Sequence, residues 1–390
     1  MQAKREKLFT YRALSDKEKK NLLIFDLLRK NKTMSRTDIS KATDINIVSI
    51  SNYIKSYIEK GYIEEKGVDV SSGGRRPELV ELRAQENYIV GIEVGAACIR
   101  VVVADLAVKV IAKETGPRPK GADKEVAAAA AALARTAIEK SRVDKTKIKM
   151  IGVGTSDSAL LEVAGEIDRE MGIETYAASD AACAAFAEKR LNPLADVDDL
   201  LYMHSDIGCG IVIKGDIYFG SGGEAGGMMI AASENGKAYE HVFAKESQYL
   251  RSWGHDMGII CFARKEIERG IGTKMVALAK GDLNNLTKDV VIEAARQNDE
   301  VAFDIIKGAA MNLGVRIAYL VNLFNPEAVV VGGGIEKAGD MVLEPIVKVV
   351  KKLAQSGPAN IVKIIPSSLG DDVVSLGAVS LAIREMFLRA

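Results

Sequence analysis

Apolar positions near the start of the chain recur with the period of amphipathic helices. Between Ser15 and Asn31, and again from Asn46 to Gly61, apolar side chains return every three or four residues. Ser15 is suited to cap the first of these helices, Asn46 begins the second, and Ser35–Thr43 fits a shorter helix between them. Three short helices in this order are typical of a helix-turn-helix, but a three-helix interaction module would share the spacing.

The third predicted helix carries the polar side chains expected of a surface that reads DNA. We expect Ile47, Ile50 and Ile54 to face the core of the module. The positions between them are small or hydrogen-bonding, as a helix that enters the major groove requires. The predicted DNA contacts in the helical part of the module are Ser35, Arg36, Thr37, Asn46, Val48, Ser49, Ser51, Asn52 and Lys55.

A predicted hairpin follows the three helices. Residues 62–66 and 79–82 read as two strands, and the glycine-rich segment 71–74 reads as the turn between them. Arg75 and Arg76 follow that turn, where they could contact a phosphate backbone or a narrow minor groove. The alternative is a pair of solvated arginines on a hairpin. Helices and hairpin together predict a winged helix-turn-helix over residues 12–84.

Charge is distributed unevenly although the formal net charge of the chain is zero. Residues 1–60 carry 14 Lys or Arg and 7 Asp or Glu, a net charge of +7 that the remaining residues balance with −7. A basic first segment on an acidic body favours a DNA-binding module joined to another domain. A merely solvated basic segment is the alternative.

Composition excludes several other classes of protein. No apolar run is long enough to cross a bilayer, and no charged segment leads into the apolar core of a signal peptide. The 4 cysteines are scattered and form no CxxC pair, which argues against a disulfide framework and for a reducing cytoplasm. We therefore expect a cytoplasmic protein without a membrane partner.

From Tyr88 onward, short apolar strands alternate with helices, which indicates α/β architecture. Several strands end in glycine turns, where backbone N–H groups commonly hold phosphates. The successive segments are YIVGIEVGAACIRVVVADL (88–106), SDAACAAFAE (179–188), DIGCGIVIKGDIYFGSGGEAGG (206–227), NLFNPEAVVVGGGI (322–335) and SLGDDVVSLGAVSLAI (368–383).

In this order, these segments resemble the ROK family, which contains bacterial sugar kinases and sugar-responsive repressors. The N-terminal module places the resemblance in the repressor branch. It implies an actin-like (ribonuclease H-like) fold of two α/β lobes, here residues 85–184 and 185–375, with the helix 376–390 packed on the first lobe. It also implies a homodimer or homotetramer.

The resemblance further assigns roles to single residues. Asp180 matches the catalytic base of the kinases, although an Asp at a helix start can also be a cap. Together with Ser179 and Glu224 it would contact a sugar. The remnants of phosphate loops would be Glu93, Gly95, Gly208, Gly210, Gly332, Gly333 and Gly334.

Departures from the kinase pattern predict a cleft that no longer performs catalysis. The first loop has Ala96 and Ala97 where kinases have Gly and Thr, and the segment between Gly152 and the helix before Asp180 is short. Gly227 stands where the family has a zinc-binding His, and its cysteine loop is missing, so no metal is expected. A different site from His241, His255 and Cys261 is a minor alternative.

We therefore expect a DNA-binding regulator, and specifically a sugar-responsive repressor with a double-stranded operator as partner. Two alternatives stay open: a regulator that responds to a protein or another metabolite, and an ATP-dependent sugar kinase with a DNA-binding module. No cofactor is expected unless the kinase alternative holds, in which case ATP and magnesium would be needed.

Overall fold

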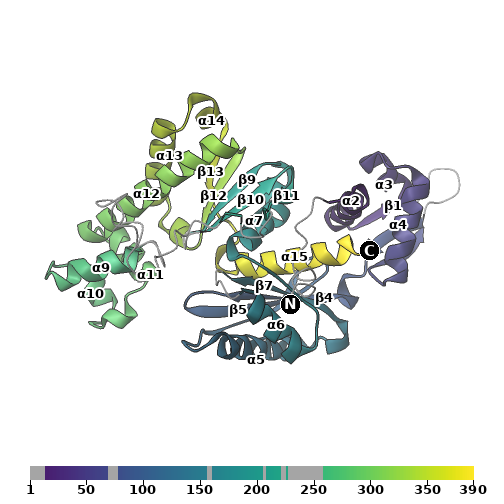
Figure 1. Cartoon of the computed structure of the whole chain (residues 1–390), viewed down its shortest axis with the longest axis horizontal. Helices are drawn as coiled ribbons and strands as arrows, with labels where there is room; N and C mark the ends of the chain where they lie inside the picture. Colours follow the sequence, from purple (N-terminus) through teal and green to yellow (C-terminus); the bar gives the residue numbers. More distant parts are fainter. Residues whose placement is uncertain (1–13, 69–77, 156–159, 205–207, 221–224, 227–257) are drawn as a thin grey trace. The chain divides into compact units, whose positions relative to one another are not determined.

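A computed structural model describes residues 14–68, 78–155, 160–204, 208–220, 225–226 and 258–390 of this chain (Figure 1). The chain divides into two compact units. The first comprises the residues up to Ser179 together with Val374–Ala390, and the second comprises Asp180–Val373. The division therefore falls before α7 (Asp180–Leu191) rather than after residue 184, because α7 packs on strands β9 and β10 of the second unit.

Three helices and a three-stranded antiparallel sheet form the N-terminal module of the first unit. In chain order the elements are α2 (Asp16–Asn31), β1 (Thr33–Ser35), α3 (Arg36–Thr43), α4 (Ile47–Glu59), β2 (Ile63–Val68) and β3 (Glu78–Leu82). Strand β3 lies between β1 and β2 and pairs with both. The predicted helices and hairpin strands are confirmed, and the arrangement is a winged helix-turn-helix. The pattern missed β1 because three residues are too few for a period of two to be visible.

Capping groups determine where the helices of this module begin. The Glu18 N–H donates to the Ser15 hydroxyl, and the Ser15 N–H donates back to the Glu18 carboxylate, which completes a capping box for α2. The side-chain oxygen of Asn46 accepts from the Ser49 N–H at 2.8 Å, so α4 begins at Ile47.

The first turn of α4 differs from the expectation in one respect. Ile47 is 45% exposed, although its spacing from Ile50 predicted an inward position. The buried face of α4 starts only at Ile50 and continues with Ile54 and Tyr57, all fully buried. The first turn of α4 therefore projects from the core of the module.

The first α/β lobe follows. Its elements are β4 (Tyr88–Val94), β5 (Cys98–Asp105), β6 (Val110–Pro117), α5 (Asp123–Ser141), β7 (Ile148–Thr155), α6 (Leu160–Met171) and β8 (Thr175–Ala178). The sheet order is β6-β5-β4-β7-β8, in which β4–β6 form an antiparallel meander and β7 and β8 run parallel to β4. The alanine-rich side of α5 lies on this sheet and buries Ala127, Ala130 and Ala134 completely.

The second unit repeats this pairing pattern. It contains α7, β9 (Leu200–His204), β10 (Gly208–Ile213), β11 (Asp216–Ile217), α9 (Ile259–Glu268), α10 (Lys274–Leu278), α11 (Lys288–Arg296), α12 (Glu300–Phe324), β12 (Ala328–Gly332), α13 (Asp340–Leu353), α14 (Ser356–Ile361) and β13 (Lys363–Pro366). The sheet order is β11-β10-β9-β12-β13, again an antiparallel meander followed by two parallel strands. These two sheets confirm the predicted α/β class.

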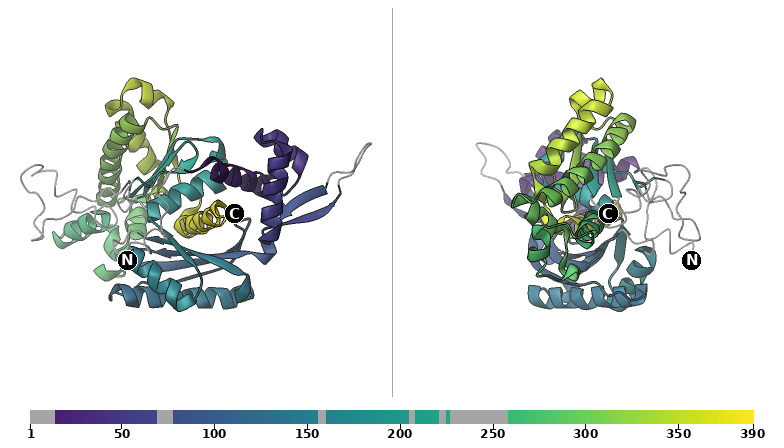
Figure 2. Two further views of the ribbon diagram at one scale, coloured as in Figure 1. Left: turned by 45° about the vertical axis from the view of Figure 1, so that its right-hand side comes forward. Right: turned by 90° about the vertical axis from the view of Figure 1, so that its left-hand side faces the viewer.

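The last helix, α15 (Val373–Leu388), returns to the first unit and lies on the face of its sheet opposite α5 (Figure 2). A Cβ atom on Gly91 of β4 would lie 2.1 Å from the Ser375 carbonyl oxygen, and one on Gly152 of β7 would lie 2.0 Å from that of Ala378. Only glycine permits this approach of helix backbone to strand. Although α15 is buried on almost every side, neither it nor any other described helix is long and apolar enough to cross a bilayer.

Candidate DNA-binding surface and effector site

The exposed side of α4 is the candidate surface for reading DNA. Val48 is 68% exposed, and Asn52 and Lys55 are exposed on the following turns. The Lys55 ammonium lies 3.9 Å from the Glu59 carboxylate, and 77% of the lysine side chain is exposed, so the pair is weak and open to competition by a phosphate. Exposed Ile47 adds a second apolar side chain beside Val48, and such a pair suits the methyl groups of thymine. Sequence periodicity had assigned Ile47 to the core, so Ile47 was missed as a candidate for the DNA-binding surface.

Two of the other predicted DNA contacts have structural roles in the free protein. Ser35 is buried, and its hydroxyl accepts from the Asp38 N–H at 3.1 Å as the cap of α3. Arg36 pairs with Glu65 at 2.6 Å and Glu78 at 3.3 Å, which ties α3 to both strands of the hairpin. Ser35 therefore stabilises the module from its core, and Arg36 does so from its surface.

The remaining residues predicted to contact DNA differ in how exposed they are. Thr37 and Asn46 are exposed, whereas Ser49 and Ser51 are half-buried. The Ser51 hydroxyl donates to the Ile47 carbonyl at 2.8 Å, within the helix. Arg75 and Arg76 lie outside the described residues, as do the predicted turn and the tip of the hairpin.

The end of α15 completes the core of this module. The ring of Phe387, which is fully buried, lies 4.3 Å from that of Phe25, 5.4 Å from that of Tyr57 and 5.3 Å from that of Tyr62, measured between centroids. These three rings come from α2, from α4 and from the turn after α4. One aromatic cluster therefore joins the DNA-binding module to the last helix of the chain.

Polar contacts fix the same junction. Asn21 of α2 is fully buried, donates to the Phe387 carbonyl at 3.0 Å and accepts from the Tyr57 hydroxyl at 2.7 Å. Burial raises the pKa of that hydroxyl, so it remains a donor. From the far end of α4, the Lys60 ammonium donates to the Arg389 carbonyl at 2.7 Å. The candidate reading helix is thus held directly by the end of α15.

The first predicted phosphate loop, in the first unit, is occupied by contacts of its own. Glu93 is buried, and its carboxylate pairs at 2.9 Å with Arg100 of the neighbouring strand. The Gly95 N–H donates to the Cys98 carbonyl at 3.0 Å, which closes the turn between β4 and β5. Arg118 donates to the Gly95 carbonyl at 3.3 Å. A carboxylate paired in this way is poorly placed to serve a metal-bound nucleotide.

The predicted sugar contacts are described in part. Ser179 and Asp180 are half-buried at the junction of β8 and α7, and Asp180 is the first residue of that helix. Its carboxylate accepts from the Ala181 N–H at 2.6 Å. Glu224 lies outside the described residues.

Gly208 and Gly210 of β10 have a packing role against α7. A Cβ on Gly208 would lie 2.6 Å from that of Ala181, and one on Gly210 would lie 2.0 Å from the Ala181 carbonyl oxygen. Close contact between strand and helix is therefore enough to require glycine at both positions, with or without a ligand. This contact also brings Gly208 beside the Asp180 carboxylate, at 3.5 Å from a Cβ built on the glycine.

The third glycine segment, Gly332–Gly334, ends β12 in a turn with positive φ at Gly333 and Gly334. A Cβ on Gly332 would lie 1.9 Å from the Tyr202 hydroxyl. The Gly334 N–H donates to the Glu336 carboxylate at 2.7 Å, and Lys288 donates to the Gly333 carbonyl. Burial raises the pKa of Glu336. A side-chain carboxylate thus occupies the N–H group that a phosphate would use.

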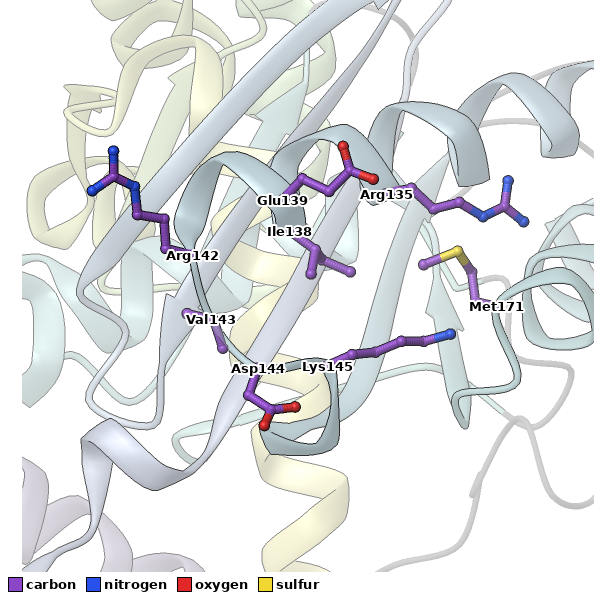
Figure 3. A pocket seen from close by; sticks show the side chains of 8 residues that line it. All are labelled: Arg135, Ile138, Glu139, Arg142, Val143, Asp144, Lys145 and Met171. Carbon is purple, nitrogen blue, oxygen red and sulfur yellow. The ribbon is translucent and has the colours of Figure 1, made fainter.

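A surface depression of about 530 Å³ lies in the first unit, at the end of α5 (Figure 3). Its apolar floor is bordered by charged side chains of both signs that do not converge on one point. None of the residues predicted for the effector site lines it. The lining residues are Arg135, Ile138, Glu139, Arg142, Val143, Asp144, Lys145 and Met171.

Within the described residues, no group of three or more His, Cys, Asp or Glu side chains is arranged to hold a metal ion. Of the alternative ligands, Cys261 is exposed on α9. Gly227, His241 and His255 lie outside the described residues.

A winged helix-turn-helix that shares a core with a two-lobed α/β body defines a class of DNA-binding regulators built on a sugar-kinase fold. The sequence profile of the ROK family matches residues 89–385, and the chain belongs to that family. It is similar to the xylose repressor of Caldicellulosiruptor bescii, with 26% identity over 95% of this chain and 96% of that protein.

Solved structures agree with this assignment of the fold. One is a ROK family transcriptional regulator, a homolog of the E. coli MLC protein, with a TM-score of 0.74 and 20% identity over 95% of this chain and 98% of that one. The other is a ROK family glucokinase from Streptomyces griseus in complex with glucose and AMPPNP, with a TM-score of 0.63 and 22% identity. The match to the glucokinase covers 76% of this chain and 99% of the glucokinase, whereas the match to the regulator covers nearly all of this chain. The body therefore has the actin-like fold of the family.

Proposed function

We propose that this chain is a sugar-responsive transcriptional repressor that acts in the cytoplasm and binds a double-stranded operator through its winged helix-turn-helix. The observation that carries the proposal is the exposed surface of α4, with Val48, Asn52 and Lys55 directed away from the core. The similarity to the xylose repressor over nearly the whole chain supports the same proposal.

A pair of matched lysines tests the DNA-binding part. Lys55 on α4 and Lys348 on α13 are 77% and 76% exposed, and each has a glutamate partner on the same helix four residues away. Bound duplexes are first selected from a random pool with the full-length protein, and their affinity is then measured by fluorescence anisotropy at several salt concentrations.

Lys55→Ala should weaken binding and reduce the slope of log K against log salt by about 0.9, because one phosphate contact is lost. Lys348→Ala should leave both quantities at wild-type values. If the protein selects no duplex, or if the two variants behave alike, α4 is not the DNA-binding surface.

For the effector, we propose a sugar held by Ser179, Asp180 and Glu224. A thermal-shift titration with pentoses, hexoses, amino sugars and their phosphates should identify it, since a ligand at about 100 times its Kd adds roughly 2.7 kcal/mol of stability. Asp180→Asn should abolish the shift without lowering the melting temperature of the free protein. If no sugar of the panel shifts the melting temperature, a protein partner or another metabolite would be favoured as the effector.

We further propose that the response requires neither nucleotide nor zinc. The pairing of Glu93 with Arg100 and the contact of Glu336 with Gly334 support this, because both occupy groups that a nucleotide would need. An ATP-dependent sugar kinase remains the second candidate, favoured by Asp180 at the start of α7 and by the similarity to the glucokinase. Release of ADP with any sugar of the panel, abolished by Asp180→Asn, would establish the kinase instead.

A homodimer completes the proposal. Each chain carries one winged helix-turn-helix within its described residues, and a palindromic operator presents two half-sites related by two-fold symmetry. Two copies of the chain would therefore be needed to read such an operator.

A further inference from the structure

The first turn of α4 carries two neighbouring apolar side chains that the fold itself does not use. Val48 is 68% exposed and Ile47 is 45% exposed. Among the described residues of the winged helix-turn-helix, Leu23 of α2 is the only other large apolar side chain that is exposed. Val48 and Ile47 are both β-branched and therefore weaker helix formers than alanine or leucine. Since neither core packing nor helix propensity explains this pair, it indicates a contact outside the chain.

One turn further along the same side of α4, the side chain of Asn52 has no internal partner. It is exposed, and within the described residues its amide takes part in no hydrogen bond. In the same module, Asn31 donates to the Leu27 carbonyl at 2.9 Å, and Asn46 caps α4. Asparagine in the middle of a helix is unfavourable, because its side chain favours caps and turns. The Asn52 amide therefore keeps its acceptor oxygen and its donor NH₂ group available for a ligand.

The two ends of this side of α4 differ in charge. Glu59 near the far end would repel phosphates, and the Lys60 ammonium is held by the Arg389 carbonyl at 2.7 Å. The first turn carries no acidic residue, and the N-terminal end of a helix has a partial positive charge. In helix-turn-helix proteins the N-terminal residues of the recognition helix contact the base edges. The turn that holds Ile47 and Val48 is therefore the end of α4 suited to enter the major groove.

The exposed groups of α4 match the major-groove edge of A·T pairs. Thymine presents a C5-methyl group there, which apolar side chains contact. Adenine presents the N7 acceptor and the N6 donor, to which an asparagine amide binds with two hydrogen bonds. Val48 and Asn52 are four residues apart in the helix, which is about 6 Å along its axis. Since successive bases are about 3.4 Å apart, the two contacts would fall one or two base pairs apart.

We propose that α4 reads A·T base pairs, with Ile47 and Val48 on the methyl groups of thymine and Asn52 on an adenine one or two base pairs away. The inference rests on the proposed function, because it names the base pairs that the DNA-binding surface prefers. Lys55 then contacts a phosphate, which fixes the position of the helix and carries no sequence information.

Deoxyuridine tests the methyl contacts, because it differs from thymidine only by the missing C5-methyl group. A duplex is selected from a random pool with the full-length protein, each thymine is replaced singly, and Kd is measured by fluorescence anisotropy. At one or two positions of a half-site, the replacement should weaken binding by the wild type about four-fold, because burial of one such group is worth about 0.8 kcal/mol. At one of these positions, Val48→Ala should bind the two duplexes with Kd values within about two-fold of each other.

Leu23→Ala is the control for Val48→Ala. Leu23 is 43% exposed on α2 and lies outside the candidate reading surface, so this variant should show the wild-type loss at every position. Because Val48 is 68% exposed and alanine is the better helix former, Val48→Ala removes no core packing. Circular dichroism should confirm that both variants are folded.

A second base analogue tests Asn52. 7-Deazaadenine lacks the N7 acceptor and still pairs with thymine. At an adenine one or two base pairs from the thymine that Val48 reads, this replacement should weaken wild-type binding at least about five-fold. Asn52→Ala should remove this difference between the duplexes, whereas Leu23→Ala should retain it. Comparing both proteins on both duplexes separates the contact itself from a general loss of affinity.

Unchanged affinity after replacement of every thymine in turn, or a Val48→Ala variant that keeps the wild-type loss, would overturn the methyl contacts. A sensitive adenine more than about two base pairs from the sensitive thymine would refute the placement of α4. These outcomes differ from failure of the proposed function, in which the protein selects no duplex and both proposals fall. A selected duplex that Val48→Ala and Asn52→Ala bind as the wild type does would remove only this inference.

Discussion

Removal of the Phe387 ring should release the DNA-binding module from the body without unfolding the body. The ring is fully buried and lies 4.3–5.4 Å, between centroids, from the rings of Phe25, Tyr57 and Tyr62. Phe→Ala at a buried site costs about 3–5 kcal/mol, and each aromatic contact adds about 0.5–1.5 kcal/mol beyond burial of area. We therefore place Phe387→Ala towards the upper part of this range.

That cost is large compared with the stability of a small module. Since every 1.4 kcal/mol is a factor of ten, a cost of about 4–5 kcal/mol should raise the equilibrium for opening of the module roughly 1,000- to 4,000-fold. The core of the first sheet, formed by β4, β7 and α5, contains none of these rings and should stay closed. DNA affinity should fall with the population of the closed module.

Amide hydrogen exchange of the full chain measures this effect element by element. Amides of α2 and α4 should exchange faster in Phe387→Ala, while those of β4 and β7 keep wild-type rates. Phe186→Ala on α7 is the control, because Phe186 is 1% exposed in the second unit and has no part in the aromatic cluster. Wild-type exchange in α2 and α4 of Phe387→Ala, or equal acceleration by Phe186→Ala, would refute the shared core.

Two further substitutions follow from the packing of single residues. Gly152→Ala should destabilise the first unit by several kcal/mol, because its Cβ would lie 2.0 Å from the Ala378 carbonyl oxygen of α15; a melting temperature close to wild type would contradict that contact. Asp299 caps α12, and although burial opposes its charge, hydrogen bonds from Ala302, Lys274 and Thr273 hold its pKa below the ordinary value. The contribution of Asp299 to the free energy of unfolding is therefore fully present above the unfolded pKa of about 3.9, and it is lost as pH falls through the lower folded pKa. Asp299→Asn should reduce the loss of stability at low pH, which urea titrations at a series of pH values measure. If Asp299→Asn loses stability at low pH as steeply as the wild type does, other carboxylates are responsible for that loss.

Sequence periodicity predicted those elements whose residues interact with close neighbours in the chain. The helices of the N-terminal module and the strands at Tyr88–Val94 and Cys98–Asp105 follow from local patterns of three to four residues or from short apolar runs. The predicted start of α4 at Asn46 is confirmed to within one residue, since Asn46 is the cap that precedes Ile47. Ile47 was misplaced because periodicity indicates a face of a helix but not where the neighbouring core ends.

Contacts between distant segments could not be predicted in this way. Nothing in the local pattern around Phe387 indicates that its partners are Asn21 and Tyr57. The glycines of the second unit illustrate another limit of sequence reasoning. Gly208 and Gly210 were predicted to belong to a phosphate loop, and the structure shows that they permit close packing of β10 on α7. A single sequence does not distinguish a glycine that makes room for a ligand from one that makes room for a helix backbone.

The shared core at Phe387 also has a consequence for how the protein is made. Asn21 and the carbonyl it binds are 366 residues apart, so at 5–20 residues per second the ribosome adds the second partner roughly 20–70 s after the first. During that interval the reading helix is already outside the ribosome but lacks the ring that completes its core. A nascent chain, or a fragment that ends before Phe387, should therefore be a poor competitor for the operator. Only chains that already contain Phe387 would then bind the operator tightly enough to repress transcription.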